Sequence, residues 1–158
     1  MELAQVIRSL DLVPHPEGGW YRETWRSPFL MNTSRGPRPV GTSIIYLLGG
    51  GAVGRLHRLA WDEVWHWHGG GPLEMHLLDG SGAHCRVLDA GVPQLVVPAG
   101  TWFGERPSAA GDGTLVGCTM APGFDPTDCE IADRDALLAS HGEAADVIRL
   151  LTPPHDTL

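Results

Sequence analysis

The segment 49–79 constrains the fold more than any other, because side-chain type alternates along most of its length. Leu73, Met75 and Leu77 form one apolar series, and polar residues fill the positions between them. Alternation with a period of two is typical of β-strands that bury one face and expose the other. Several such strands in succession must close around a shared interior, so the segment predicts a sheet that encloses a core or a pocket.

The rest of the chain extends this pattern into an all-β domain with a short helix near each end. The 21 glycines and 13 prolines favour the many turns of a sandwich or jelly-roll barrel over a helical bundle. We expect strands at 20–26, 42–48, 54–60, 63–68, 73–79, 83–89, 94–97, 101–106 and 114–120, and helices at 2–10, 133–140 and 144–151. The segment 27–39 has three prolines and few apolar residues, and we expect a loop there, either a lid or an interface arm. A length of 158 residues fits one domain, 1–158.

Charge and cysteine usage narrow the classes of partner. A net charge of −8 argues against nucleic acid and against an anionic membrane surface, since both are bound by clustered Lys and Arg. No apolar run approaches the length of a membrane span, and the N-terminus does not resemble a signal peptide. The three cysteines form no pairing framework, which predicts reduced thiols and a cytoplasmic protein.

Two spaced motifs in the chain resemble those of the cupin superfamily. The first runs Gly49, five residues, Arg55-Leu56-His57, five residues, Glu63, six residues, Gly70, and the second is Pro98-Ala99-Gly100-Thr101-Trp102-Phe103. PHPEGGWYRET, DEVWHWHGG and APGF further resemble the single-domain cupins of family five. The resemblance implies an RmlC-like double-stranded β-helix and a homodimer, and it implies no established reaction.

The resemblance also implies a metal site, which two substitutions disrupt. Metal-dependent cupins hold their ion with two histidines, a glutamate and a later histidine, but here the first histidine is Arg55 and the later one is Phe103. Only His57 and Glu63 remain, and the protonated arginine cannot ligate a cation. We therefore expect no metal cofactor.

We expect Arg55, His57 and Glu63 to converge at the barrel mouth and to act on a small molecule. Histidine titrates near neutrality and suits proton transfer. The R-x-H arrangement resembles the sugar-nucleotide epimerases of the wider fold. By that resemblance His57 would take a proton next to a carbonyl, Arg55 would hold a phosphate or oxyanion, and a tyrosine, for which we choose Tyr46, would return the proton. This hypothesis makes the protein a metal-independent isomerase acting on a sugar or sugar nucleotide.

Further side chains are candidates for contact with the ligand. These are Tyr21, Glu23, Trp65, Trp67, Trp102 and Phe103. Aromatic rings can form a platform for a planar ligand, and they serve equally well as core. We interpret His15 and Glu17 as a structural corner whose backbone needs the two following glycines.

Two alternatives remain open. A binding or sensing module would use the same pocket without chemistry. A divalent-metal enzyme would use His57, Glu63 and the two strand histidines His66 and His68. Strand parity places His66 and His68 on the face opposite Glu63, which argues against the metal enzyme.

Overall fold

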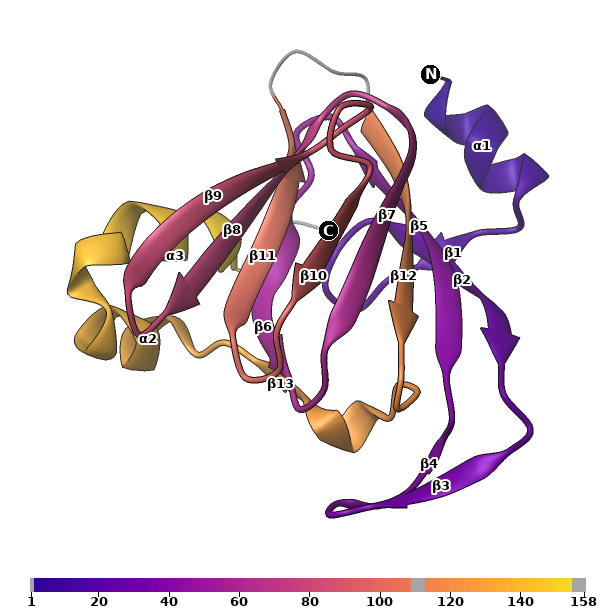
Figure 1. Ribbon diagram of the computed structural model, residues 1–158. Helices are drawn as coiled ribbons and strands as arrows, with labels where there is room; N and C mark the ends of the chain where they lie inside the picture. Colours follow the sequence, from indigo (N-terminus) through magenta and orange to yellow (C-terminus); the bar gives the residue numbers. More distant parts are fainter. Residues whose placement is uncertain (1, 109–112, 155–158) are drawn as a thin grey trace.

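The computed structural model describes residues 2–108 and 113–154, and two antiparallel sheets, of six and five strands, form a barrel (Figure 1). The six-stranded sheet has the order β1 (Val13–Pro14), β2 (Trp20–Arg26), β5 (Thr42–Gly49), β12 (Gly113–Met120), β7 (Glu63–Gly70) and β10 (Gln94–Val97). The five-stranded sheet has the order β13 (Cys129–Ile131), β6 (Gly54–Leu59), β11 (Trp102–Pro107), β8 (Leu73–Asp79) and β9 (Gly82–Leu88). This arrangement confirms the predicted all-β jelly-roll barrel, and the predicted strands agree with it to within a residue or two at most ends.

The core lies between the two sheets because the alternating strands turn their apolar series inward. Leu73 and Met75 on β8 are fully buried and meet Trp65 of the opposite sheet in one hydrophobic cluster. Phe103 and Leu48 complete the packing from β11 and β5. The period-two pattern of the sequence therefore corresponds directly to the inside and the outside of the barrel.

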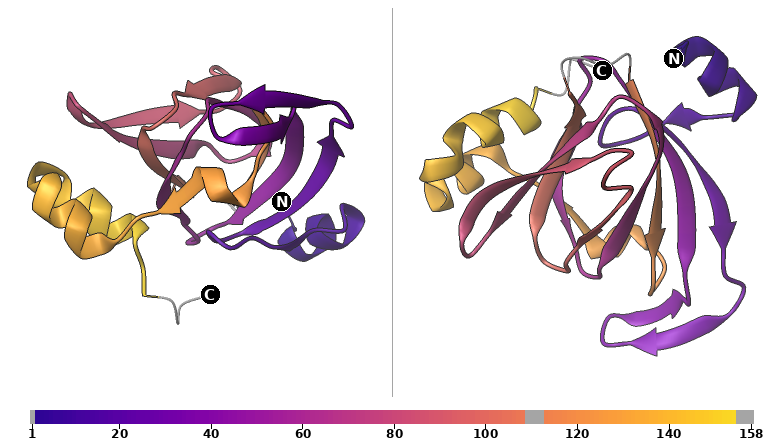
Figure 2. Two further views of the ribbon diagram at one scale, coloured as in Figure 1. Left: turned by 90° about the horizontal axis from the view of Figure 1, so that it is seen from below. Right: turned by 45° about the horizontal axis from the view of Figure 1, so that its top comes forward.

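Short helices cover the outer face of the five-stranded sheet near the C-terminal end of the chain (Figure 2). They are α2 (Arg134–Ser140), η2 (Gly142–Ala144) and α3 (Ala145–Leu151), and α1 (Leu3–Ser9) lies at the other end of the chain. Leu56 points outward from β6 and packs with Ile148 and Leu151, both fully buried. The helices thus form a second, smaller core. No helix in residues 2–108 and 113–154 is long and apolar enough to cross a membrane.

The segment 27–39 is not the loop that its prolines predict. It contains the hairpin β3 (Leu30–Thr33) and β4 (Gly36–Pro39), which projects from the barrel below β2 and β5 (Figure 1). Of the residues in its two strands only Arg38 is buried, so no alternation of side-chain type marks the hairpin. The prolines are tolerated because the ladder has only two strands, and each strand has an edge that needs no N–H donor.

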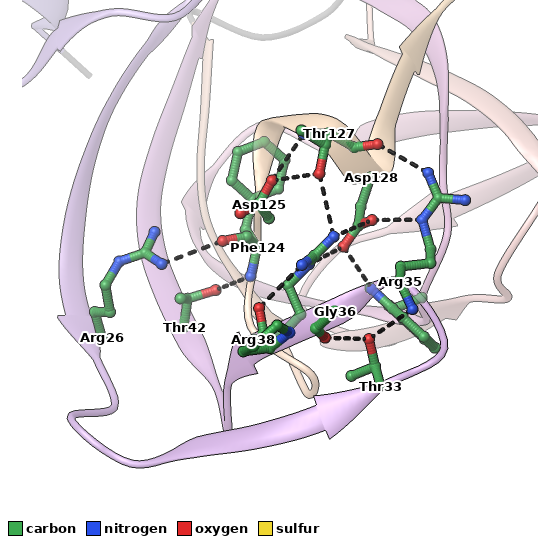
Figure 3. Close-up of polar contacts among 12 residues, drawn as sticks. Arg26, Thr33, Arg35, Gly36, Arg38, Thr42, Phe124, Asp125, Thr127 and Asp128 are labelled. Atoms are coloured by element: carbon green, nitrogen blue, oxygen red, sulfur yellow. Dashed lines mark hydrogen bonds and ion pairs between the residues drawn. The ribbon is translucent and has the colours of Figure 1, made fainter.

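Buried ion pairs hold this hairpin to η1 (Pro126–Asp128), as Figure 3 shows. The side chain of Asp128 is fully buried and accepts hydrogen bonds from Arg38 Nε at 2.6 Å and Nη2 at 2.9 Å. Arg35 Nε donates to the same carboxylate at 2.6 Å, and Trp61 Nε1 donates at 2.7 Å. These bonds hold the pKa of Asp128 well below its usual range, with the Arg38 hydrogen bond as the largest cause.

Candidate functional site

A cavity of about 380 Å³ opens into the barrel between the two sheets. It is lined by His15, Pro16, Glu17, Tyr21, Glu23, Arg26, Thr42, Ile44, His57, Leu59, Glu63, Cys118, Met120, Phe124 and Pro126. Strands of both sheets contribute, together with the turn before β2 and the segment after β12. Apolar walls with a few convergent polar groups are typical of small-molecule sites.

His57 is buried in the wall of this cavity, and both ring nitrogens have partners. Nδ1 lies 2.7 Å from the backbone oxygen of Arg55, which can only accept, so Nδ1 carries a proton. Nε2 lies 3.3 Å from Glu17 Oε2. The ring also packs against Phe103 with 4.1 Å between centroids. The imidazole is therefore fixed in orientation, with Nε2 as the atom that gains or loses a proton.

Glu17 is a site residue that the sequence interpretation as a structural corner missed. Its side chain reaches into the cavity, and its Oε1 accepts a hydrogen bond from Cys129 Sγ at 3.3 Å. Glu17 Oε2 faces His57 Nε2 at 3.3 Å, which is close enough for the carboxylate and the imidazole to pass a proton between them, as an acid–base pair does. The side chain extends from a turn, so strand parity could not have shown where it points.

The glycines after Glu17 explain how this turn fits against the barrel. Gly18 and Gly19 have φ of +116° and +71°. A Cβ at Gly18 would lie 2.2 Å from Val53 O, and one at Gly19 would lie 2.7 Å from Leu47 O. Only glycine permits this approach and this backbone angle. The prediction that this turn needs two glycines is correct. The turn that they form places Glu17 at the cavity.

Glu63 lies deep in the same cavity beside Trp65, and both side chains face inward as parity predicts. Glu63 is 8% exposed, and its Oε2 accepts a hydrogen bond from Trp65 Nε1 at 2.8 Å. Burial raises the pKa of Glu63 to about 8, the charge of Glu17 adds to the rise, and the hydrogen bond from Trp65 opposes it. At neutral pH Glu63 therefore holds its proton and can donate it.

A second cavity of about 30 Å³ lies behind the first. Its lining includes Glu105, which the sequence did not predict as a site residue. Glu105 is 1% exposed, and its Oε2 has no hydrogen-bond partner among the described residues. Burial raises its pKa well above the usual range, with further contributions from the charges of Glu17 and Glu63. Glu105 shares the inward parity of Phe103 on β11, and that alternation is the signal that could have identified it.

Tyr21 and Glu23, which we expected at the ligand, line the larger cavity, and Tyr46, which we expected to return a proton, lines the smaller one. Tyr46, however, is buried and its hydroxyl donates to the backbone oxygen of Gly18 at 2.9 Å. Burial raises the pKa of Tyr46 well above its usual value. Its hydroxyl therefore holds the glycine turn in place, which is a poor arrangement for returning a proton to a ligand.

Arg55 does not converge with His57 and Glu63, so this part of the predicted site is wrong. Phe103 pairs with His57 and Glu105 pairs with Gly54, so β6 has one residue more than β11 between these two points. This β-bulge reverses the side-chain alternation between Arg55 and His57. Arg55 Nη1 donates to the backbone oxygen of Pro153 at 2.6 Å, in a separate pocket beside the C-terminal helices.

Three of the tryptophan and phenylalanine residues expected at the ligand lie elsewhere. Trp102 packs on the outer core with the helices, and Arg58 stacks over its ring at 4.6 Å. Trp67 is half-buried and donates from Nε1 to Gly71 O at 3.2 Å. Phe103 is fully buried behind His57. Neither cavity includes any of these three side chains in its described lining, whereas Trp65 lies at the inner cavity.

The donor set does not fit the metal site of metal-dependent cupins. Within residues 2–108 and 113–154, no three His, Cys, Asp or Glu side chains are placed to hold a metal ion together. Phe103 supplies no ligand, and His57 already uses both nitrogens. His66 lies outside on β7 with its Nδ1 3.1 Å from Gln94 Nε2, and His68 is exposed. The chemistry of this cavity is therefore best described through its own side chains.

Comparison with known proteins identifies relatives over almost the whole length. Residues 4–132 match the model of Cupin_5, described as "Cupin superfamily (DUF985)". Uncharacterized protein YML079W of Saccharomyces cerevisiae is 31% identical over 144 residues, covering 78% of this chain and 71% of the yeast protein.

Solved structures agree with that family. A hypothetical protein from Leishmania major is 32% identical with a TM-score of 0.89, over 96% of this chain and 98% of that one. Protein SO0799 from Shewanella oneidensis is 35% identical with a TM-score of 0.85, over 96% and 97%. Oxalate decarboxylase from Bacillus subtilis, at 15% identity and a TM-score of 0.58 over 87% of this chain and 36% of that one, shares the fold.

Proposed function

The chain belongs to the Cupin_5 family of the cupin superfamily, and we propose that its barrel cavity binds a small organic molecule and moves protons on it. The observation that carries the proposal is the contact between His57 Nε2 and Glu17 Oε2 at 3.3 Å, in the cavity wall that also includes Glu63. Acid–base isomerisation requires a general base, a partner that orients the base, and a nearby acid that keeps its proton until it is needed.

The proposed chemistry needs no oxidant and no metal. The His57–Glu17 pair, which is neutral while it holds one proton between its members, takes a second proton from a carbon next to a carbonyl, and the C–H electrons form the carbon–carbon double bond of an enol. Glu63 gives its proton to the carbonyl oxygen at the same time. The pair then gives its proton to the former carbonyl carbon, while the hydroxyl on the deprotonated carbon gives its proton to Glu63 and becomes the new carbonyl, which yields the isomer and restores the site.

The ligand proposed here is a sugar or a molecule of similar size rather than a sugar nucleotide. The phosphate anchor expected of Arg55 lies in a separate pocket, behind the sheet. A volume of about 380 Å³ is near the lower end for ligand pockets, which favours a compact molecule.

The test is exchange of carbon-bound hydrogen with solvent. Glucose, mannose, fructose and glucosamine are incubated with the protein in D₂O, and loss of the signal of the carbon-bound proton is followed by ¹H NMR. We expect exchange with at least one sugar, and loss of that exchange in both His57→Asn and Glu17→Gln. Exchange that persists in both variants would show that the pair is not the base.

A non-catalytic binding module is the second candidate, because the same lining suits a ligand that does not react. His57 distinguishes the two. If the residue is catalytic, His57→Asn keeps most of the affinity for a bound sugar and abolishes its exchange. If the residue is only a binding contact, the variant loses affinity and the wild-type protein shows no exchange.

A further inference from the structure

The charge of the two cavities points to the class of ligand. Four carboxyl side chains line them, and they are Glu17, Glu23, Glu63 and Glu105. We propose that the ligand of this cavity carries a positively charged amino group, in addition to any group that reacts. This ligand would occupy the same cavity as in the proposed function, and the inference rests on that function only in taking the cavity to bind a small molecule.

Within the described residues, the lining of the two cavities contains one basic side chain that is permanently charged, Arg26. Its Nε and Nη2 donate to both oxygens of Glu23 at 2.9 and 2.7 Å, and its Nη1 donates to Phe124 O at 3.2 Å. The guanidinium is thus already paired within the wall. A phosphate or carboxylate on a ligand would have to displace Glu23 to reach it.

The other arginines near the barrel have partners outside the cavity. Arg55 donates to the chain near the C-terminal helices, and Arg35 and Arg38 bind Asp128. The sequence contains no lysine. An anionic ligand would therefore enter a low-dielectric site beside carboxyl groups without a free counter-charge, whereas an ammonium group could pair with Glu17, or with Glu63 once that carboxyl has lost its proton.

Aromatic side chains at the cavity support the same assignment. Tyr21 and Phe124 both line it, and aromatic faces attract ammonium groups that have lost part of their hydration. The apolar remainder of the lining, including Ile44, Leu59 and Met120, excludes water and strengthens an ion pair inside.

An ammonium ligand would also be coupled to a proton on Glu63. Without ligand, burial and the charge of Glu17 raise the pKa of Glu63 to about 8, so at neutral pH the carboxyl is mostly protonated. A cation close to it favours the carboxylate and lowers that pKa. Binding therefore releases a proton below about pH 8, and affinity rises with pH in that range.

Other titratable groups share the inner cavity with Glu63 and come from several elements. They are His15, Glu17, Tyr46, His57, Glu105 and Cys118. Burial raises the pKa of Glu105 and of Cys118 and lowers that of His15, so all three favour their neutral forms near pH 7. The proton released on binding is assigned to Glu63 because this carboxyl also lines the larger cavity, whereas Glu105 lines only the smaller one, and a variant of Glu63 tests the assignment.

The test uses three molecules of one shape and different charge. Glucamine (sorbitol with an amino group in place of one terminal hydroxyl) is positive, sorbitol is neutral and sorbitol phosphate is negative. Isothermal titration calorimetry of the wild-type protein should give an affinity for glucamine about tenfold or more above that for sorbitol, with sorbitol phosphate the weakest. Affinity for glucamine should rise by up to about tenfold from pH 6 to pH 7.

Two variants connect the result to this cavity. In Glu63→Gln we expect the rise with pH to disappear, together with the difference between binding enthalpies measured in phosphate and in Tris, which reports released protons. Glu130→Gln removes an exposed carboxylate that pairs with Arg58 away from both cavities, and it should behave like the wild type.

Three results would overturn the proposal. They are tighter binding of sorbitol phosphate than of glucamine, equal binding of glucamine and sorbitol, and no measurable binding of glucamine. Failure of the proposed function looks different, because glucamine has no carbonyl. Glucamine binding without deuterium exchange on any sugar would leave the ligand class intact and remove the isomerase. Deuterium exchange on a sugar, together with tighter binding of sorbitol phosphate than of glucamine, would leave the isomerase intact and remove the proposed ligand class.

Discussion

The space for the buried carboxyl of Glu105 exists because residue 54 is a glycine. A Cβ built on Gly54 would lie 1.7 Å from Glu105 Oε1, well inside van der Waals contact. Gly54 also stands at the start of the bulge that turns Arg55 away from His57. Gly54 and Glu105 therefore form one unit of packing in the inner cavity.

This overlap predicts that Gly54→Ala destabilises the protein by about 1–3 kcal/mol, the usual cost of overpacking a core. Chemical denaturation measures the loss, and Glu105→Ala should relieve it, so Gly54→Ala costs less in the Glu105→Ala background. Gly80→Ala is the matched control, since a Cβ added there would meet no other atom within 4 Å. An equal cost in both backgrounds would show that Glu105 is not the obstacle.

The raised pKa of Glu63 predicts a pH dependence of stability. The native state holds this proton more tightly than the unfolded state does, between a pKa of 4.5 and one of about 8. Stability is therefore fully present below pH 4.5 and is lost as pH rises to about 8, by up to about 4 kcal/mol for this group.

Thermal unfolding of Glu63→Gln checks this dependence. Glutamine can still accept the hydrogen bond from Trp65 and carries no proton to lose, so the variant should gain stability over the wild type as pH rises from about 4.5 to about 8. Glu130→Gln serves again as control and should follow the wild-type curve. Parallel curves for the wild type and Glu63→Gln would contradict the buried protonated carboxyl.

At the residue scale, the candidate site could be predicted only where side-chain direction follows from a regular strand. Glu63, Trp65, Tyr21 and Glu23 line the cavities as expected. The bulge in β6 put Arg55 outside the cavity, and a sequence pattern does not reveal one extra residue in a ladder. Glu17 extends from a turn, where no periodicity applies.

At the scale of elements, the hairpin β3–β4 depends on Asp128 more than on a hydrophobic core. The side chain of Arg38 is 7% exposed. If Asp128 lost its negative charge, the positive charge of Arg38 would remain buried without a counter-charge. Breaking a buried pair in this way typically costs about 3–5 kcal/mol. The hairpin can therefore be detached from η1 by one isosteric change.

We predict that Asp128→Asn loses stability of this order and that hydrogen exchange accelerates across residues 30–39. Exchange followed by mass spectrometry resolves that segment from the barrel strands. Glu130→Gln breaks the exposed pair with Arg58 and should cost at most about 1 kcal/mol. Unchanged exchange in the hairpin of Asp128→Asn would mean that other contacts hold it.

The hairpin also marks the limit of prediction for the elements. Strands such as β7 and β8 bury one face and carry an alternating pattern, so they were predicted to within a residue or two. In β3 and β4 only Arg38 is buried, so neither strand has an alternating pattern, and composition alone suggests a loop. Prolines in the sequence indicated an irregular segment where the structure has an isolated ladder.

At the scale of the whole molecule, large apolar side chains gather on and beside the projecting hairpin. They are Trp25, Phe29, Leu30, Met31 and Val40, between 40% and 74% exposed. Large exposed apolar side chains that gather in one region are typical of protein interfaces. We propose that a second copy of the chain covers it, in keeping with the homodimer that the resemblance to cupins implies.

Analytical ultracentrifugation should then give about twice the chain mass of 17.0 kDa. The variant Phe29→Asp with Leu30→Asp should be monomeric, because two charges would be buried at the interface. Val92→Asp places a charge on a side chain that is 49% exposed away from the hairpin and should stay dimeric. A monomeric wild type, or a dimer in both variants, would contradict this arrangement.

The proposed chemistry depends on one proton shared between His57 and Glu17, and long-range ¹H–¹⁵N NMR of the His57 imidazole detects that proton. We predict a protonated Nδ1, bound to Arg55 O, and an Nε2 shift between those of a bare and a protonated nitrogen. In Glu17→Gln the Nε2 signal should move to that of a plain neutral imidazole. An Nε2 signal that does not change in Glu17→Gln would contradict the acid–base pair and, with it, the proposed chemistry of the cavity.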